Sequence, residues 1–305
     1  MYDIIVVGAG PAGLTAALYA LRANKKVLIF EAKAYGGQIL NANLVENYPG
    51  IPNISGFDYA TNLYNQVKEL GGEFKFETVL KVDDSKNVIT NSGEYSAKAV
   101  ILATGAENRK LNIDGEDTFV GKGVSYCATC DGNFYKGKTV AVVGGGNTAL
   151  EDAIYLSNIA SRVYLIHRRD EFRGEGKYTK DLKLKDNVEF ILNSNVVKLN
   201  GEDKLDSIDV KNNNGDITSL DIDGLFIAVG QAPKNEMFAN VVDLNEHGYA
   251  MVGEDLHTKI DGIYVAGDTR VKSLRQLTTA TSDGSVAATT AIREMKKNES
   301  NWNRW

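Results

Sequence analysis

The sequence predicts an α/β protein made of two related domains, with the second domain inserted into the first. Three observations support this prediction. A glycine-rich turn follows a buried strand near the N-terminus, the same pattern returns near residue 144, and no third glycine turn precedes the last strand and helix. At 305 residues the chain exceeds the usual size of one domain. We expect the first domain to comprise residues 1–109 and 241–305, and the inserted domain residues 110–240.

A strand, a turn and a helix are expected at the N-terminus. Residues 3–7 form a β-branched run without alternation, which is typical of a strand buried on both faces of a parallel sheet. A Gly-x-Gly-x-x-Gly turn follows, and then a helical stretch, 14–23. In such a turn the first glycine permits a tight bend, the second lets the backbone approach a pyrophosphate, and the third lets helix and strand pack closely. The turn consists of Gly8, Ala9, Gly10, Pro11, Ala12 and Gly13.

The next strand, 27–30, ends at Glu31. A carboxylate at this distance from the turn can accept hydrogen bonds from a ribose hydroxyl, and the helix N-terminus offers free N–H groups to a pyrophosphate. Strand, turn, helix and acid together predict a Rossmann-like dinucleotide-binding domain. A strand–turn–helix unit formed for packing only is the alternative.

The same design returns in the second half of the chain. A strand over 138–143 leads into a Gly-x-Gly-x-x-Ala turn, a helical stretch over 150–159 and a strand over 162–166. The turn consists of Gly144, Gly145, Gly146, Asn147, Thr148 and Ala149. The position of Glu31 is taken here by His167, which is followed by Arg168, Arg169 and Arg173. Guanidinium groups bind a 2′-phosphate that a carboxylate would repel, so this unit predicts an NADP(H) site. A solvated basic strand end is the alternative.

The two units also end alike. Residues 99–105 and 224–230 are apolar strands that run into small residues. A further buried strand, 262–268, ends in Gly-Asp and precedes a helical stretch of small residues, 280–295. Because this C-terminal part has no glycine turn of its own, it most simply completes the first domain.

The two cysteines of the chain, Cys127 and Cys130, form a CxxC pair that is followed by Asp131. Such a pair can carry two electrons by alternating between disulfide and dithiol, and can pass them on by thiol–disulfide exchange. A zinc site would need four ligands, and the sequence has no second CxxC, so we expect no metal. Two unrelated buried cysteines remain the structural alternative.

The composition limits the class of protein. A net charge of −6 gives no general attraction to nucleic acid or to an anionic membrane. Residues 4–21 carry no charge, but Asp3 precedes them, and glycines and a proline interrupt them, unlike a signal peptide or membrane span. Two cysteines cannot form a disulfide scaffold for a chain of this size, so a cytoplasmic protein is expected.

Over nearly its full length the chain resembles the low-molecular-weight, bacterial-type thioredoxin reductases, which are homodimeric FAD enzymes of the pyridine nucleotide-disulfide oxidoreductase family. The matching motifs are VGAGPAG, GGQI, ENYPG, ATGA, CATCDG, GGGNTALE, HRRDEFR, GIYVAGD and the pair RQ. The resemblance implies two Rossmann-like domains, the first for FAD and the inserted one for NADPH and the cysteines. Around FAD it places Gly36, Gly37, Gln38, Asn47, Ala103, Gly105, Gly267, Asp268, Arg275, Gln276 and Leu277.

The resemblance also implies residue roles. Cys130 would be the sulfur nearer the flavin, Cys127 the sulfur that attacks the partner disulfide, and Asp131 the acid that protonates the leaving thiolate. A hydride would pass from NADPH to FAD, and electrons would continue through the dithiol to oxidised thioredoxin. Asn133 departs from the aromatic or small apolar residue that the family often has there, in a region that the resemblance implies helps to dock thioredoxin.

Other functions stay open at this point. Relatives that feed ferredoxin or flavodoxin lack the CxxC, and relatives fed by ferredoxin lose the second glycine turn and the arginines, whereas this chain has all of these. The same scaffold could reduce a different protein disulfide. A nucleotide-binding redox sensor is the non-enzymatic alternative. The last eight residues hold both tryptophans, and we expect Trp302 or Trp305 to pack against the first domain or a neighbouring subunit.

Overall fold

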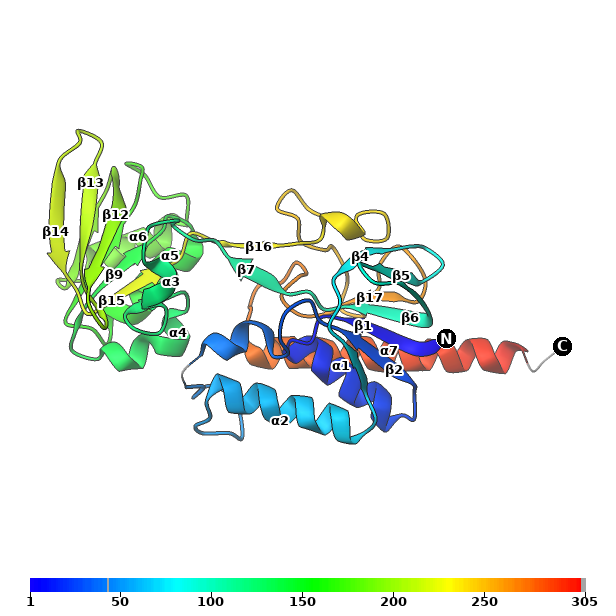
Figure 1. Cartoon of the computed structure of the whole chain (residues 1–305). Coiled ribbons are helices and arrows are strands. Elements are labelled where there is room, and N and C mark those ends of the chain that lie inside the picture. Colours follow the sequence, from blue (N-terminus) through cyan, green and yellow to red (C-terminus); the bar gives the residue numbers. More distant parts are fainter. Residues whose placement is uncertain (43, 303–305) are drawn as a thin grey trace. The chain divides into compact units, whose positions relative to one another are not determined.

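The computed structural model describes residues 1–42 and 44–302, with only the backbone at 41 and 298–302 (Figure 1). The chain forms two compact units: Met1–Glu107 together with Ala232–Trp305, and Asn108–Gln231. The two connections between the units are strands β7 (Ala106–Asn108) and β16 (Gln231–Pro233), which pair with each other. The predicted α/β class, with one unit inserted into the other, is confirmed. The domain limits at 109/110 and 240/241 stay a prediction.

The first unit is built on a sheet of seven strands in the order β3-β2-β1-β6-β5-β4, with β17 paired to β6. Strands β1, β2, β3, β6 and β17 run parallel, whereas β4 and β5 form an antiparallel meander with β6. The strands are β1 (Tyr2–Val7), β2 (Val27–Phe30), β3 (Glu73–Lys75), β4 (Val79–Val82), β5 (Asn87–Thr90), β6 (Glu94–Leu102) and β17 (Ile263–Val265). The pairing of β17 with β6 shows that the C-terminal part completes the first sheet.

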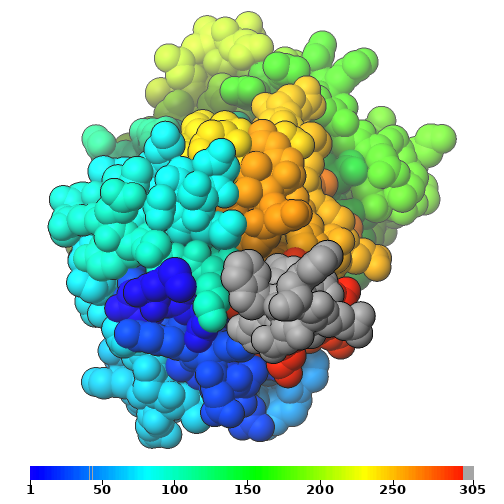
Figure 2. All heavy atoms as spheres, turned by 90° about the vertical axis from the view of Figure 1, so that its right-hand side faces the viewer, coloured from blue at the N-terminus to red at the C-terminus, as the bar shows by residue number. Residues whose placement is uncertain are grey.

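The helices of this unit are α1 (Pro11–Arg22), α2 (Gly56–Glu69) and α7 (Leu277–Trp302), with the 3₁₀ turns η1 (Gly37–Asn41) and η3 (Glu236–Phe238). Helix α1 begins three residues before the predicted start, because proline is favoured in the first helical position. Small residues let α1 and α7 approach closely: a Cβ on Gly284 would lie 2.2 Å from Ala12 O. In Figure 2 the blue and cyan N-terminal residues and the orange C-terminal residues form one continuous surface.

The second unit repeats this plan. Its parallel sheet has the order β11-β10-β9-β15-β8, and a separate antiparallel sheet has the order β12-β13-β14. The strands are β8 (Val124–Ser125), β9 (Thr139–Val143), β10 (Arg162–Ile166), β11 (Val188–Ile191), β12 (Ser194–Gly201), β13 (Leu205–Asn212), β14 (Ile217–Asp221) and β15 (Gly224–Ile227). The helices are α3 (Glu116–Phe119), α4 (Ala128–Asp131), α5 (Asn147–Ser157) and α6 (Gly176–Lys183), with the 3₁₀ turn η2 (Gly132–Tyr135).

In each unit the central strands are buried on both faces, as their apolar sequences predicted. Since parallel strands end at the same edge of a sheet, the residues that follow β1, β6 and β17 lie together, and so do those that follow β9, β10 and β15. Several predicted ligand residues directly follow these strands, among them Gly8, Ala103, Gly144 and His167. None of the helices within residues 1–42 and 44–302 is long and apolar enough to cross a membrane. The packing expected of the two tryptophan side chains lies outside the described residues.

Candidate active site

The first glycine turn leaves open space at one position only. Gly8 has φ +106°, and a Cβ there would lie 2.4 Å from Ala103 O. A Cβ on Gly13 would lie 1.9 Å from Gly8 O, so α1 rests directly on the turn. A Cβ on Gly10 would meet no atom within 4 Å, and no side chain caps the N-terminus of α1 at this residue. Open space beside uncapped N–H groups fits a phosphate group.

Two other predicted residues are held against this turn by the backbone. The carboxylate of Glu31 accepts hydrogen bonds from Ala9 N–H and Lys33 N–H, both at 2.9 Å. Gly36 N–H donates to Ala9 O at 2.7 Å, which brings Gly36 and Gly37 to the turn. A Cβ on Gly37 would lie 3.3 Å from Gly10 Cα. The structure thus brings Glu31, Gly36 and Gly37 together around Gly10.

Asp268, which lies just beyond β17, has an unsatisfied buried oxygen. Its Oδ1 has no hydrogen-bond partner among the described residues, and Lys272 Nζ is 3.7 Å away. Burial raises the pKa of the Asp268 carboxyl, while the Lys272 and Arg275 cations oppose that rise. Buried polar atoms in proteins are almost always hydrogen-bonded, so Asp268 Oδ1 fits a ligand hydroxyl group as its partner.

Asp283 on α7 holds the turn that carries Asp268. Its Oδ2 accepts a hydrogen bond from Gly267 N–H at 3.0 Å, and its carboxylate makes two hydrogen bonds with Arg270, both at 2.8 Å. Lys272 Nζ lies 2.9 Å from the same Oδ2. Asp283 was not predicted as a site residue, although an acid within a run of small helical residues is the kind of exception that indicates a specific partner.

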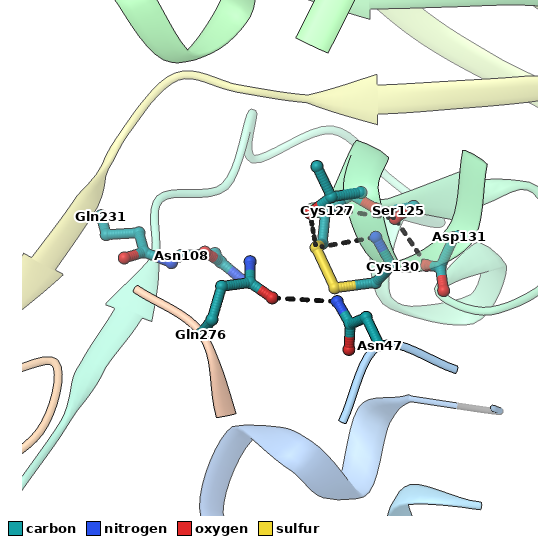
Figure 3. The surroundings of a disulfide bond; sticks show 9 residues. Asn47, Asn108, Ser125, Cys127, Cys130, Asp131, Gln231 and Gln276 are labelled. Carbon is teal, nitrogen blue, oxygen red and sulfur yellow. Dashed lines mark hydrogen bonds between the residues drawn. A yellow bond between two sulfur atoms is a disulfide. The ribbon is translucent and has the colours of Figure 1, made fainter. Parts of the chain in front are cut away.

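The remaining predicted residues of this unit lie on neighbouring segments. Arg275 donates to Asp268 O at 3.3 Å, and its guanidinium lies 4.2 Å from the centre of the Tyr249 ring. Asn47 donates to Gln276 Oε1 at 3.1 Å, so residues far apart in the sequence meet (Figure 3). The other predicted positions are Gln38, whose amide donates to Ala106 O, Gly105, which has φ +69°, and Leu277, which begins α7.

The second glycine turn is packed like the first, although Gly144, unlike Gly8, does not have a positive φ. A Cβ on Gly144 would lie 2.4 Å from Ala228 O, and Ala149 is buried where the first turn has its third glycine. A Cβ on Gly146 would meet nothing within 4 Å, and the N-terminus of α5 there has no side-chain cap. This turn also fits a phosphate group.

His167 lies beneath the second turn. Its ring is 5% exposed, and a Cβ on Gly145 would lie 2.0 Å from its Cε1, so only glycine fits above the ring. Phe172 stacks on the ring at 5.2 Å. Burial lowers the pKa of the imidazole, and Nε2 finds no hydrogen-bond partner in the part of the chain that is described. The buried ring is therefore neutral near pH 7 and packs on the turn.

The predicted arginines are exposed beside this turn. Arg168 and Arg169 directly follow His167, and Arg173 N–H donates to Gly145 O at 2.8 Å, which ties their loop to the turn. Asn147 joins the same loop, since its Oδ1 accepts a hydrogen bond from Glu175 N–H at 2.8 Å. Thr148 is exposed in the first turn of α5. Three guanidinium groups next to an open glycine turn suit a ligand with an additional phosphate.

The cysteines form a disulfide, Cys127–Cys130, with an S–S distance of 2.04 Å (Figure 3). Cys127 caps the short helix α4: its Sγ accepts a hydrogen bond from Cys130 N–H at 3.2 Å. The hydroxyl of Thr129 lies 3.4 Å from the same sulfur. Donors directed at a sulfur stabilise its thiolate after reduction.

Asp131 ends α4 and is linked to Ser125, which was not among the residues predicted from the sequence. Ser125 Oγ donates to Asp131 Oδ2 at 2.6 Å (Figure 3). Burial raises the pKa of the Asp131 carboxyl, and the hydrogen bond from Ser125 opposes that rise. A carboxyl group with a raised pKa next to a disulfide is suited to proton transfer.

Within residues 1–42 and 44–302, no group of three or more His, Cys, Asp or Glu side chains could hold a metal ion. The candidate site consists of two glycine turns with open space beside them and a disulfide with a neighbouring acid. This donor set fits organic cofactors with phosphates and a redox-active disulfide.

Known proteins share this arrangement. Residues 2–284 match the pyridine nucleotide-disulphide oxidoreductase family. The chain is 42% identical to thioredoxin reductase of Bacillus subtilis over 293 residues, which is 94% of this chain and 93% of that protein. It is 42% identical to thioredoxin reductase of Treponema pallidum over 292 residues, 94% of this chain and 95% of that protein. The crystal structure of thioredoxin reductase from Streptococcus pyogenes, 39% identical, covers 97% of this chain and 99% of its own with a TM-score of 0.92.

The likeness therefore extends over most of the length of both chains and is not confined to a single motif. The matched residues of this chain, 2–284, include both glycine turns and the CxxC between them, and the Cys127–Cys130 disulfide fits the redox-active pair. On these grounds the chain belongs to the pyridine nucleotide-disulphide oxidoreductase family.

Proposed function

We propose that this chain is an NADPH-dependent thioredoxin-disulfide reductase that carries FAD. The observation that supports this most directly is the Cys127–Cys130 disulfide, capped within α4 and placed next to the partly buried acid Asp131. Relatives named thioredoxin reductase, 42% identical over nearly the whole chain, support the choice of thioredoxin as the protein substrate.

Membership of the family implies a flavin and a pyridine nucleotide. We assign FAD to the first unit, with its pyrophosphate at Gly10, its ribose at Glu31 and a hydroxyl group at Asp268 Oδ1. NADPH is assigned to the second unit, with its pyrophosphate at Gly146 and its 2′-phosphate at the arginines. When bound, FAD supplies the two electrons that reduce the disulfide, after it has received them from NADPH as a hydride.

The residues of the chain carry out the exchange that follows. Once the disulfide is reduced, the Cys127 thiolate attacks one sulfur of oxidised thioredoxin, and Asp131 gives its proton to the leaving thiolate. The Cys130 thiolate then attacks the Cys127 sulfur, which restores the Cys127–Cys130 disulfide and releases the second thioredoxin sulfur. Asp131 then takes up a proton from water, so each cycle moves two electrons to thioredoxin and leaves the protein unchanged.

The flavin absorbance tests the proposal under anaerobic conditions. NADPH is expected to bleach the flavin of the purified protein rapidly, NADH much more slowly, and oxidised thioredoxin is expected to restore the absorbance. A flavin that NADPH fails to bleach would contradict the assigned donor and would favour a ferredoxin-like one. Recovery limited to a single equivalent of thioredoxin would favour the redox sensor.

Replacing the open glycines separates cofactor binding from folding. Gly10→Ala adds a Cβ that meets no protein atom within 4 Å, so the melting temperature of the apoprotein is expected to change little. The same methyl group would occupy the space assigned to the pyrophosphate, so bound FAD is expected to fall by about tenfold or more. Gly146→Ala is the matched variant in the second unit: it should retain FAD and lose NADPH affinity. Unchanged cofactor binding in both variants would overturn the assigned phosphate positions.

A second copy of the chain is the other proposed partner. A groove of about 570 Å³ lies between α1, α2 and α7 of the first unit, and the exposed apolar side chains Tyr19, Leu70 and Val286 lie on the same elements or directly beside them. An open groove with exposed apolar side chains on the elements around it favours burial against another surface. We therefore propose a homodimer, which light scattering in solution tests.

The cytoplasm is the proposed compartment, because thioredoxin, the proposed substrate, helps to keep thiols reduced there.

A further inference from the structure

The hydroxyl of Ser125 contacts both ends of the redox-active turn. Ser125 is the last residue of β8, pairs in register with Phe226 of β15, and is 4% exposed. Its Oγ accepts a hydrogen bond from Cys127 N–H at 3.1 Å and donates one to Asp131 Oδ2 at 2.6 Å (Figure 3). A residue fixed in the sheet thus binds the cysteine that begins the turn and the carboxylate that ends it.

The backbone of α4 does not by itself orient the carboxylate. Cys130 N–H and Asp131 N–H both donate to Cys127 O, at 3.3 and 3.1 Å, and these bonds hold the main chain of the turn. These bonds do not fix the two side-chain torsions of Asp131, each of which has several staggered or broad minima. The hydrogen bond from Ser125 selects one of these orientations, and its length lies in the range of charge-assisted O–H···O⁻ bonds.

The same bond acts on the proton that Asp131 carries. Burial raises the pKa of the Asp131 carboxyl because it penalises the charged form, and the Ser125 hydroxyl lowers it because it donates to that form. A buried carboxylate that had lost its proton without this donor would be left less well solvated. Ser125 therefore stabilises the state that Asp131 reaches after it has given up its proton.

We propose that Ser125 is a positioning residue for thiol–disulfide exchange, holding the Asp131 carboxyl beside the disulfide and stabilising the carboxylate formed by proton donation. This inference rests on the proposed function, in which Asp131 protonates the leaving thiolate. In that step the Cys127 thiolate forms a new S–S bond with one sulfur of the substrate disulfide. The old S–S bond breaks, its electron pair leaves on the other sulfur, and that sulfur takes the Asp131 proton.

The expected effect of replacing Ser125 on the exchange rate depends on the pKa of the thiol that leaves the substrate disulfide. A leaving thiol of high pKa needs a proton as it departs, whereas an aromatic thiolate of low pKa departs without one. Hydroxyethyl disulfide has a leaving thiol of the first kind, and dithiobis(nitrobenzoate) has one of the second kind. A role of Asp131 and Ser125 in proton transfer should thus slow exchange with the first reagent and spare the second.

The experiment uses the holoenzyme reduced with dithiothreitol, freed of reductant under argon and mixed with either reagent near pH 7. Single-turnover exchange is followed by acid quenching and mass spectrometry. Ser125→Ala is expected to slow exchange with hydroxyethyl disulfide by about tenfold, and exchange with dithiobis(nitrobenzoate) by less than about twofold. Ser125→Thr, which keeps the hydroxyl, should recover most of the loss. Ser194→Ala is the matched control: Ser194 is also 4% exposed, but its hydroxyl donates to Leu192 O.

Equal slowing with both reagents would mean that Ser125 only maintains the turn, and no slowing with either would mean that it has no role. Both results overturn the proposal. Asp131→Asn should match Ser125→Ala in its dependence on the reagent, and a different dependence would also overturn it. This assay needs neither NADPH nor thioredoxin, so it tests Ser125 independently of the proposed function. A wild-type protein that reacts with both reagents but fails to reduce thioredoxin would count against the proposed function only.

Discussion

Cys127→Ser is expected to lower thioredoxin reduction by about 1000-fold or more, because Cys127 supplies the attacking thiolate and the remaining Cys130 thiol has no partner with which to close the disulfide again. The reaction of NADPH with the bound flavin should persist, since the phosphate positions at Gly10 and Gly146 are untouched. Anaerobic bleaching of the flavin and the thioredoxin assay, measured on the same sample, check this pair of results. The substitution replaces the sulfur of residue 127 with oxygen. It does not change the backbone N–H of this residue, which donates a hydrogen bond to Ser125 Oγ.

Cys130→Ser should give a different result that separates the roles of the two sulfurs. Cys127 would still attack thioredoxin, but no second thiol would resolve the mixed disulfide, so a covalent complex with thioredoxin should accumulate. A non-reducing gel or intact mass measures it. If Cys127→Ser formed the covalent complex and Cys130→Ser did not, the order of the two sulfurs would be reversed. Ser194→Ala serves as the control that leaves both sulfurs in place.

Removing the three arginines beside the second turn should change cofactor choice. In the triple variant Arg168→Ala, Arg169→Ala, Arg173→Ala, the KM for NADPH is expected to rise by about 100-fold or more, because each charge-assisted bond to a phosphate contributes roughly 1.5–3 kcal/mol. The KM for NADH should change by less than about threefold, since NADH lacks the 2′-phosphate. Steady-state kinetics with both cofactors give the two values.

A control with the same change in net charge distinguishes specific binding from general attraction. Lys180, Lys183 and Lys198 are exposed residues of the same unit, and replacing all three by alanine removes the same number of positive charges. This variant should keep its preference for NADPH. If this variant lost its preference for NADPH over NADH to the same extent as the arginine variant, the arginines would act only through the general electrostatic field of the unit. The assigned contact with the 2′-phosphate would then be wrong.

The two glycine turns could be predicted from the sequence because the strand–turn–helix pattern is contained in a short segment. The structure adds the reason for Gly8 and Gly144, where a Cβ would strike the carbonyl of Ala103 or Ala228 at the end of the neighbouring strand. The apolar strands before the turns and the C-terminal strand were also recognisable, because burial on both faces leaves a continuous apolar run. The boundaries were less exact: α5 begins at Asn147, three residues before the predicted stretch.

Contacts between distant segments could not be predicted in this way. Asp283 meets Gly267 and Arg270 only because α7 packs along α1, and nothing in its neighbourhood in the sequence indicates those partners. The burial of His167 beneath Gly145 likewise depends on the loop after β10 folding back to the glycine turn. The sequence placed His167 at a cofactor site, but it did not indicate that its ring would be covered and neutral.

By itself, the sequence determined the α/β class, the two nucleotide-binding units and the redox-active pair, since each depends on local backbone geometry or on residue types at short spacing. Only the tertiary structure decided how the side chains around these features are oriented and charged. Asp131 follows the CxxC in the sequence, but its pKa and its orientation depend on burial and on Ser125, which β8 and β15 hold in place. Solvation and hydrogen bonding act through space, so they follow from the packing of the strands.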